Sequence, residues 1–322
     1  MNIKRILALL MALLCGCSIL TSCAVADDGT QTGAQTETQE SVVSGLYKQN
    51  PAEDDVMNIL MIGNSFCYYY VEELYGMLTA AGYKNVNVCN VYYSGCSLKY
   101  HWDWWKNGEA KYEFYITNEN GRNKTEGTSL EYCLKQRNWD LISLQDSFAG
   151  MRSDGVEGYL QISKPWRTEL WERIKELFPQ SRHVWHQSWS YQLGYDRSGV
   201  KIQDFAQQEH DMQLQRSYAL AVCEELSLER FNTGEAWQIV RKGGYDDLCA
   251  RLNINGGLGD YYHDGDIGGG QYLNACVWFE AITGQSCIGN TYRPDYSLDE
   301  ARTETLQKAA HPAIADRDAE AN

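Results

Sequence analysis

The sequence predicts an α/β protein with three layers, α/β/α, around a central, mostly parallel sheet of about five strands. Short apolar runs typical of buried strands recur at residues 56–62, 86–92, 140–144, 182–186 and 229–232. Segments with apolar residues at helical spacing alternate with them, at residues 67–81, 129–136, 164–178, 202–226 and 270–282. Strands that alternate with helices form a parallel sheet covered on both faces.

Residues 101–127 interrupt this alternation. Their pattern is irregular, but residues 111–117 alternate between apolar and polar, and Asn118-Glu119-Asn120-Gly121 is a turn sequence. We therefore expect a β-hairpin in this segment.

Residues 1–22 are predicted to be a targeting segment that is not part of the fold. Lys4 and Arg5 precede an apolar run, residues 6–14, that is too short to span a bilayer as a helix. Leu20-Thr21-Ser22-Cys23 resembles the lipobox of bacterial lipoproteins, which implies cleavage before Cys23 and lipidation of that cysteine. A plain secretory signal peptide with an incidental cysteine is the alternative.

The rest of the chain divides into three parts. Residues 23–50 are rich in Thr, Gln, Glu, Gly and Ser and are predicted to be a flexible tether. Residues 51–296 have the length and apolar content of one α/β domain. Residues 297–322 are expected to be a charged C-terminal tail that contains a final helix.

Charge and cysteine content limit the possible partners. Removal of residues 1–22 takes away Lys4 and Arg5 and no acidic residue, so the net charge falls from −15 to −17. This acidity argues against nucleic acid or an anionic lipid surface as a partner. Eight cysteines follow Cys23, and their pairing cannot be predicted because eight cysteines allow 105 pairings.

The first predicted strand leads directly into the most informative stretch. Gly63 and Asn64 end the strand, and Ser65 follows at the mouth of a helix, where ligands bind in open α/β sheets. Ile62-Gly63-Asn64-Ser65-Phe66 resembles the first block of the SGNH (GDSL-type) hydrolases, with Asn64 in place of the Asp of GDSL. The resemblance implies a flavodoxin-like fold, a nucleophilic Ser65 and no cofactor. An ordinary helix cap is the alternative role for Ser65.

The other blocks of that family can be matched in order. Gly95 follows the second strand, where the resemblance implies a backbone N–H near the oxyanion. Gln145 follows the third strand, where the family usually has Asn, so it is the candidate side-chain donor to the oxyanion. With Ser65 N–H, these two groups are the expected oxyanion hole. Asp260-Tyr261-Tyr262-His263 matches the Asp-x-x-His of the last block, which implies His263 as base and Asp260 as its orienting carboxylate.

Several residues near these blocks are candidates for substrate contacts. Aromatic rings commonly stack on sugars, and the sequence contains 22 Tyr and 10 Trp. The candidates are Asn64, Trp104, His186, Gln187 and Trp189. A packing role is the alternative for the aromatic rings, and a satisfied core histidine is the alternative for His186. We expect no metal site, because the loop of His263, Asp264 and Asp266 is more typical of a turn.

The sequence thus predicts a lipid-anchored serine esterase in the bacterial cell envelope that removes O-acetyl groups from carbohydrate. Two other functions remain open at this point. One is a glycan-binding lipoprotein that kept the fold but lost catalysis, and the other is a lipase or thioesterase for longer acyl chains.

Overall fold

The computed structural model describes residues 55–320 except residues 148, 198–199, 245–247, 249, 253–257, 261, 264–267 and 296–297. The expected signal peptide, the lipidation site Cys23 and the tether lie outside the described residues, as do Asp264 and Asp266. All described residues belong to one compact unit, residues 43–322. Within the described ranges, every helix is too short or too polar to cross a membrane.

A seven-stranded sheet forms the centre of this unit, in the order β4-β3-β2-β1-β5-β6-β9. Five strands pair in parallel: β1 (Val56–Gly63), β2 (Asn85–Tyr92), β5 (Leu141–Leu144), β6 (Arg182–Gln187) and β9 (Glu229–Asn232). The expected hairpin is β3 (Tyr112–Asn118) and β4 (Gly121–Thr128), and it adds two antiparallel strands beside β2. The predicted five-stranded parallel core is confirmed, and the hairpin extends it.

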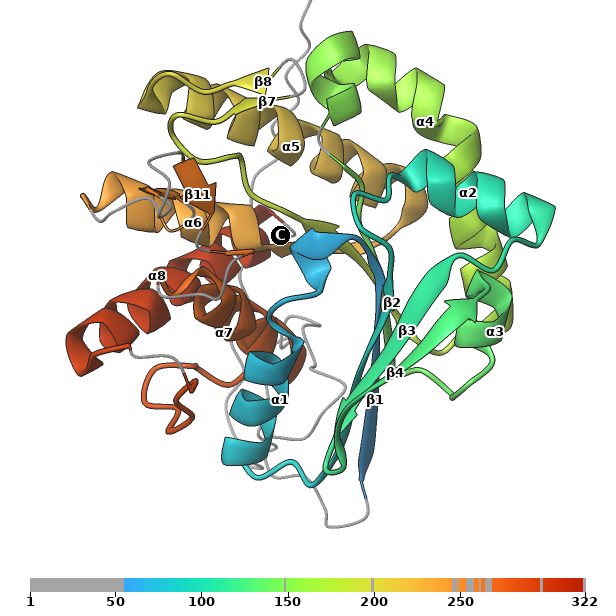
Figure 1. The fold of residues 1–322 in the computed structure, drawn as a ribbon, viewed down its shortest axis with the longest axis horizontal. Helices are drawn as coiled ribbons and strands as arrows, with labels where there is room; N and C mark the ends of the chain where they lie inside the picture. The colour runs from blue at the N-terminus through green and yellow to red at the C-terminus, as the bar shows by residue number, and fades with distance from the viewer. Residues whose placement is uncertain are drawn as a thin grey trace, which may run out of the picture. The chain divides into compact units, whose positions relative to one another are not determined.

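Helices cover both faces of the sheet, which makes the three predicted layers (Figure 1). One face carries α1 (Val71–Ala80), α6 (Thr233–Lys242), α7 (Gly270–Thr283) and α8 (Glu300–Glu320). The other face carries α2 (Leu98–Asn107), α3 (Leu130–Leu134), α4 (Ala149–Leu177) and α5 (Phe205–Leu226). Two short hairpins, β7–β8 (Asp196–Arg197 and Val200–Lys201) and β10–β11 (Ala250–Leu252 and Leu258–Asp260), lie outside the main sheet.

Strand β1 shows why the core has two halves. Ile59 and Met61 point into the apolar cluster under α1 and α7, while Leu60 and Ile62 point into the cluster under α2 and α4. All four side chains are fully buried. Each such burial stabilises the fold by roughly 1.5–3 kcal/mol, so a strand that is apolar at every position is expected at the centre of the sheet.

The structure corrects the expectation of irregular chain at residues 101–127. Residues 98–107 form helix α2, whose first turn is capped by Ser97 and whose end is marked by Gly108 with φ of 64°. This helix was not predicted, because its first residues, Leu98-Lys99-Tyr100-His101-Trp102, include His, Trp and Tyr, which have modest helix propensity. Helix α6 was also missed, since Gly234 stands at its second position. A Cβ on Gly234 would lie 2.3 Å from the Ser188 carbonyl oxygen, so the glycine is required by close packing.

The C-terminal helix α8 packs into the core of the folded unit. Leu306, Ala309, Ala310 and Ala313 of α8 are buried in the core cluster under α7. Asn232 Nδ2, at the end of β9, donates to the Ala313 carbonyl at 2.6 Å. The folded unit therefore continues past residue 296.

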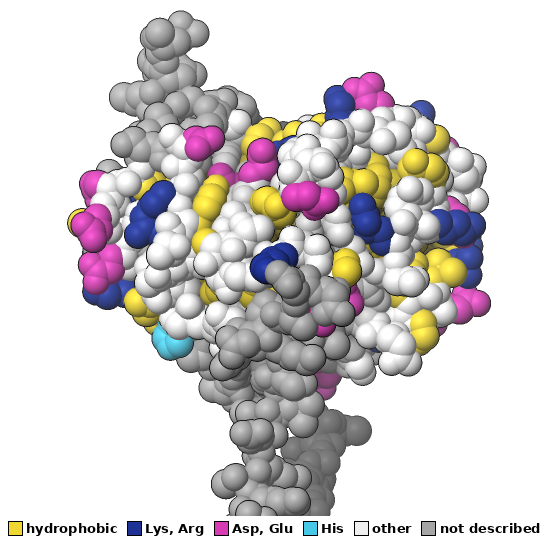
Figure 2. Space-filling view, turned by 90° about the horizontal axis from the view of Figure 1, so that it is seen from below, with side chains coloured by type: hydrophobic (Ala, Val, Ile, Leu, Met, Phe, Trp, Pro, Cys, Tyr) yellow, Lys and Arg dark blue, Asp and Glu magenta, His cyan; other side chains and the backbone are white. Residues whose placement is uncertain are grey.

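The face of the molecule that lies at the bottom of Figure 1 has a mixed surface. Figure 2 shows acidic and basic side chains scattered among hydrophobic ones on its described part, without a field of one sign. The described side chains on this face form no basic stripe of the kind that binds nucleic acid.

Candidate active site

The candidate site lies at the carboxyl ends of β1 and β5. Strand β1 pairs with β2 on one side and with β5 on the other, so the order of strands reverses between β1 and β5. Crevices at such a reversal are the usual ligand sites of open α/β sheets. Gly63 ends β1 and Gln145 directly follows β5, which places the first and third sequence blocks side by side.

Ser65 begins a single turn of 3₁₀ helix, Ser65–Cys67, directly after β1. Asn64 caps this turn, because its Oδ1 accepts from the Phe66 N–H at 3.0 Å and its carbonyl accepts from the Cys67 N–H at 3.1 Å. Ser65 itself is half-buried, whereas Asn64 is only 2% exposed. The cap is therefore made by Asn64, and the helix-cap alternative for Ser65 does not describe its local role.

The Asn64 side chain joins the three blocks. Its Nδ2 donates to the Cys96 carbonyl, one residue after Gly95, at 2.8 Å. Its Oδ1 also accepts a short hydrogen bond from Gln145 Nε2. A backbone N–H can only donate and a carbonyl can only accept, so Phe66 and Cys96 fix the orientation of the Asn64 amide. That orientation in turn requires that Gln145 presents Nε2 to Asn64 Oδ1.

Gln145 is held tightly above the end of β1. It is 1% exposed, and a Cβ on Gly63 would lie 2.5 Å from Gln145 Cγ and 2.9 Å from Cys67 Sγ. Glycine at position 63 is thus required by the passage of the Gln145 side chain. One Nε2 hydrogen of Gln145 is used by Asn64, and an amide nitrogen carries two.

Gly95 lies in the exposed turn between β2 and α2, with φ of 65°, a value that favours glycine. The Cys96 N–H closes this turn on the Tyr93 carbonyl at 3.1 Å. Because Asn64 holds the Cys96 carbonyl, the glycine turn is tied directly to the serine turn.

Asp146 was not expected as part of the site, although it follows Gln145 at the end of a strand. It is buried and accepts from the Leu98 N–H at 2.8 Å, the Ser147 N–H at 2.7 Å and the Tyr159 hydroxyl at 2.6 Å. Burial raises the pKa of its carboxyl to about 6, against these hydrogen bonds, which lower it. Asp146 thereby fixes the loop after β5 to the first turn of α2.

His263 approaches the serine turn from a segment almost two hundred positions further along the chain. Its ring lies 6.3 Å from the Phe66 ring and 5.3 Å from the Tyr69 ring, between centroids, and it is half-buried. The preceding residue, Tyr262, donates its hydroxyl to the Ser65 carbonyl at 3.1 Å and also contacts the Phe66 carbonyl at 3.3 Å. The segment is held from behind by Gln271 Nε2, which donates to the Tyr262 carbonyl at 2.6 Å. The segment of Tyr262 and His263 is thus docked on the Ser65–Phe66 turn, and the pairing of His263 with Ser65 stays a prediction.

Asp260 ends strand β11, where its backbone pairs with Ala250. Its side chain lies outside what the structure describes, so its role beside His263 stays a prediction. Tyr262 docks the histidine segment on the serine turn, and the sequence did not reveal this, because only the contact with Ser65 distinguishes it from other tyrosines.

Most of the expected substrate-contact residues are buried. Trp189 is 2% exposed and stacks on Trp237 at 4.5 Å with an interplanar angle of 4°. His186 and Gln187 are also 2% exposed. Asn64 makes the three side-chain hydrogen bonds described above. These four side chains are buried in the structure, and their expected contacts with a substrate stay a prediction.

Trp104 is the exception among these candidates. It is half-buried on α2 and contacts the rings of Tyr93 at 4.8 Å and Tyr100 at 5.4 Å. Tyr93 is 41% exposed and Tyr100 is 51% exposed, so the three rings form an accessible aromatic surface beside Gly95.

Among the described residues, no group of three or more His, Cys, Asp or Glu side chains is arranged to hold a metal ion. The seven described cysteines, Cys67, Cys89, Cys96, Cys133, Cys223, Cys276 and Cys287, are free thiols.

The chain belongs to the family described as a domain of unknown function (DUF4886), which matches residues 58–313. It is similar to the crystal structure of a DUF4886 family protein from Bacteroides uniformis, with 26% sequence identity and a TM-score of 0.69 over 82% of this chain and 96% of that chain. No curated protein matches the chain.

More distant similarities to solved structures concern the fold alone. One is a candidate SGNH hydrolase from Slackia heliotrinireducens, with 18% identity and a TM-score of 0.43 over 71% of this chain and 100% of that chain. Another is an acetylxylan esterase from Geobacillus stearothermophilus, with 14% identity and a TM-score of 0.42 over 70% of this chain and 94% of that chain.

Proposed function

We propose that the protein is a serine ester hydrolase of the SGNH type. The observation that carries this proposal is the docking of Tyr262 and His263 on the Ser65–Phe66 turn. Nucleophilic catalysis needs a base within reach of the serine, and this docking holds the histidine segment against the serine turn. Through its hydrogen bonds, Asn64 also holds the turn that contains Gly95 and the side chain of Gln145 against the serine turn.

In the proposed mechanism, Ser65 Oγ attacks the acyl carbon while His263 takes its proton. The oxyanion receives hydrogen bonds from the N–H groups of Ser65 and Gly95 and from the second Nε2 hydrogen of Gln145. The C–O bond breaks, and the alcohol leaves with the proton from His263. Water then attacks the acyl-enzyme, His263 takes a proton from that water, Ser65 recovers it, and the carboxylic acid is released. Asp260 orients His263 in this scheme.

The proposed substrate is an O-acetylated carbohydrate. Support comes from the accessible surface of Tyr93, Tyr100 and Trp104, which lies beside the Gly95 turn and offers ring faces to a sugar. We further propose that Cys23 carries a lipid that anchors the enzyme in the cell envelope.

Release of acetate from a panel of acetylated oligosaccharides tests the function. We expect acetate from the wild-type protein and essentially none from Ser65→Ala, with unchanged melting temperature. Ser153→Ala, which removes an exposed hydroxyl on α4, serves as the matched control and should keep full activity. Binding of the glycans without acetate release would favour a non-catalytic binding protein. Full activity of the Ser65→Ala variant would show that Ser65 is not the nucleophile.

His263→Ala provides a second test. We expect it to be as damaging as Ser65→Ala, and the double variant to lose little more, because nucleophile and base act as a unit. Additive losses would mean that the two residues act separately.

A further inference from the structure

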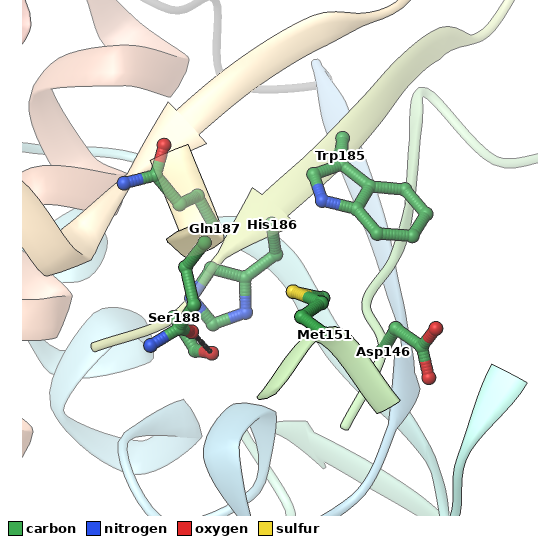
Figure 3. A pocket seen from close by; sticks show the side chains of 7 residues that line it. Asp146, Met151, Trp185, His186, Gln187 and Ser188 are labelled. Carbon is green, nitrogen blue, oxygen red and sulfur yellow. Dashed lines mark hydrogen bonds between the residues drawn. The ribbon is translucent and has the colours of Figure 1, made fainter. Parts of the chain in front are cut away.

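A small polar pocket lies behind the candidate site, at the carboxyl ends of β5 and β6. Figure 3 shows the side chains of Asp146, Met151, Trp185, His186, Gln187 and Ser188 around it, and Gln215 of α5 completes the lining. All seven residues are at most 6% exposed. The space open to the centre of a water-sized sphere is about 10 Å³, which is close to that of one water molecule.

The tautomer of His186 follows from its neighbours. Thr233 donates its only hydroxyl hydrogen to the Gln187 carbonyl at 2.8 Å. Thr233 Oγ1 lies 2.9 Å from His186 Nε2, so it can only accept there, and Nε2 must carry the proton. Burial lowers the pKa of His186 to about 3, so the ring is neutral near pH 7. His186 Nδ1 is therefore a bare acceptor.

This acceptor and a donor on Gln215, which also lines the pocket, both lack a partner among the described residues. His186 Nδ1 is buried and has no hydrogen-bond partner among the described residues. Gln215 accepts from the Ser188 hydroxyl at 2.8 Å through Oε1, and its buried Nε2 likewise has no partner within the described chain. An unpaired buried polar group costs about 1–3 kcal/mol, so two in one pocket call for a ligand.

We propose that the pocket is a binding site for one water molecule, which donates to His186 Nδ1 and accepts from Gln215 Nε2. A water molecule has both capacities and the right size, and buried waters typically satisfy such leftover groups. Acetic acid offers the same pair of groups but has four heavy atoms, too many for this space. A metal ion would meet the Nε2 hydrogens of Gln215, which repel it. Asp146, the only carboxylate in the lining, already accepts two hydrogen bonds at Oδ1 and one at Oδ2.

The role that this water would have is structural. It would join the end of β6 to α5, directly beside the Asp146 loop, and would hold the strand end that leads to Trp189. This inference does not depend on the proposed esterase activity.

A high-resolution crystal structure and NMR together test the proposal. We expect a fully occupied water peak within hydrogen-bond distance of both His186 Nδ1 and Gln215 Nε2. In ¹⁵N spectra, His186 should show a protonated Nε2 and an unprotonated, hydrogen-bonded Nδ1 from pH 5 to pH 8.

Two variants complete the design. Gln215→Met keeps the size of the side chain and removes its donor, so the water peak should disappear or lose most of its occupancy. Gln213→Met makes the same exchange at an exposed position of α5 and should leave the water in place. A dry pocket in the wild type, a protonated Nδ1, or a larger bound molecule would each overturn the proposal. Retention of the water in Gln215→Met would do so as well.

Discussion

Asn64 and Gln145 are the two positions at which the chain departs from the SGNH pattern, and the structure shows that they contact each other. Gln145 Nε2 donates to Asn64 Oδ1, while Asn64 Nδ2 donates to the Cys96 carbonyl. An aspartate at position 64 could accept from Gln145 but would place a second oxygen against the Cys96 carbonyl. The two departures therefore form a compatible pair. The sequence revealed each of them singly, but their contact depends on the pairing of β1 with β5.

Gln145 supplies the first prediction at this scale. Gln145→Ala should lower kcat of the proposed esterase about 10²–10³-fold with little change in KM, because an oxyanion donor acts mainly in the transition state. Steady-state kinetics on an aryl acetate measure this. Gln136→Ala, at an exposed glutamine after α3, is the control. An effect confined to KM would instead make Gln145 a substrate-binding residue.

Asp146 predicts a specific pH dependence of stability. Its pKa is about 6 in the folded protein and roughly 3.9 in an unfolded chain. The folded state thus holds the proton more tightly, so this contribution to stability is complete below about pH 4 and is lost as pH rises through 6. Asp146→Asn mimics the protonated form and should lack this loss, which amounts to at most about 3 kcal/mol. Urea unfolding of both proteins from pH 4 to pH 7 provides the comparison. A constant difference between the two proteins would contradict the raised pKa.

Trp104 and Trp189 should respond differently to replacement by alanine. Trp104 borders the accessible aromatic surface, so Trp104→Ala should reduce activity on glycan acetates far more than on a small aryl acetate. Trp189 lies between Phe66, Trp237 and Tyr262, so Trp189→Ala should cost about 3–5 kcal/mol of unfolding free energy. Kinetics on both substrates and denaturant unfolding separate the two roles. Equal losses on both substrates for Trp104→Ala would show that its ring only packs.

At the scale of elements, the parallel strands were predictable because their apolar runs are buried on both faces. Val56–Gly63 and Asn85–Tyr92 are the clearest cases. Helices α2 and α6 were not predicted, since α2 is rich in aromatic residues and α6 has a glycine at its second position, and packing stabilises both. The histidine segment was located by its Asp-x-x-His spacing. Its contact with Ser65 through Tyr262 belongs to tertiary structure and has no signal in the sequence.

Helix α8 gives a prediction about the limits of the folded unit. Leu306 is 1% exposed and lies against Gly269, where an added Cβ would come within 2.4 Å of it. Leu306→Ala should therefore lower the free energy of unfolding by about 2–5 kcal/mol. Leu220→Ala, at a side chain that is 37% exposed on α5, should have little effect. If both variants unfold at the same denaturant concentration, α8 contributes nothing to the core.

At the scale of the whole molecule, the proposed anchor can be tested apart from the chemistry. Cys23→Ser should move the protein from the membrane fraction to the soluble fraction of cells, because the lipid supplies the proposed attachment and no described helix is suited to span a bilayer. Immunoblots of the fractions, with Cys17→Ser as the matched control in the targeting segment, measure this. A Cys23→Ser protein that stays with the membrane would show that the lipobox interpretation is wrong.

The attachment of α8 also bears on the order in which the molecule matures. Arg302 Nε donates to the Gly268 carbonyl at 2.9 Å, so the last helix holds the end of the loop that carries His263. A ribosome releases Ser65 early and Arg302 near the end of synthesis. The nascent chain can therefore form the sheet and the serine turn well before its histidine loop is secured. We expect the proposed esterase to be inactive throughout translation and to become active only when its final helix has been synthesised and has docked.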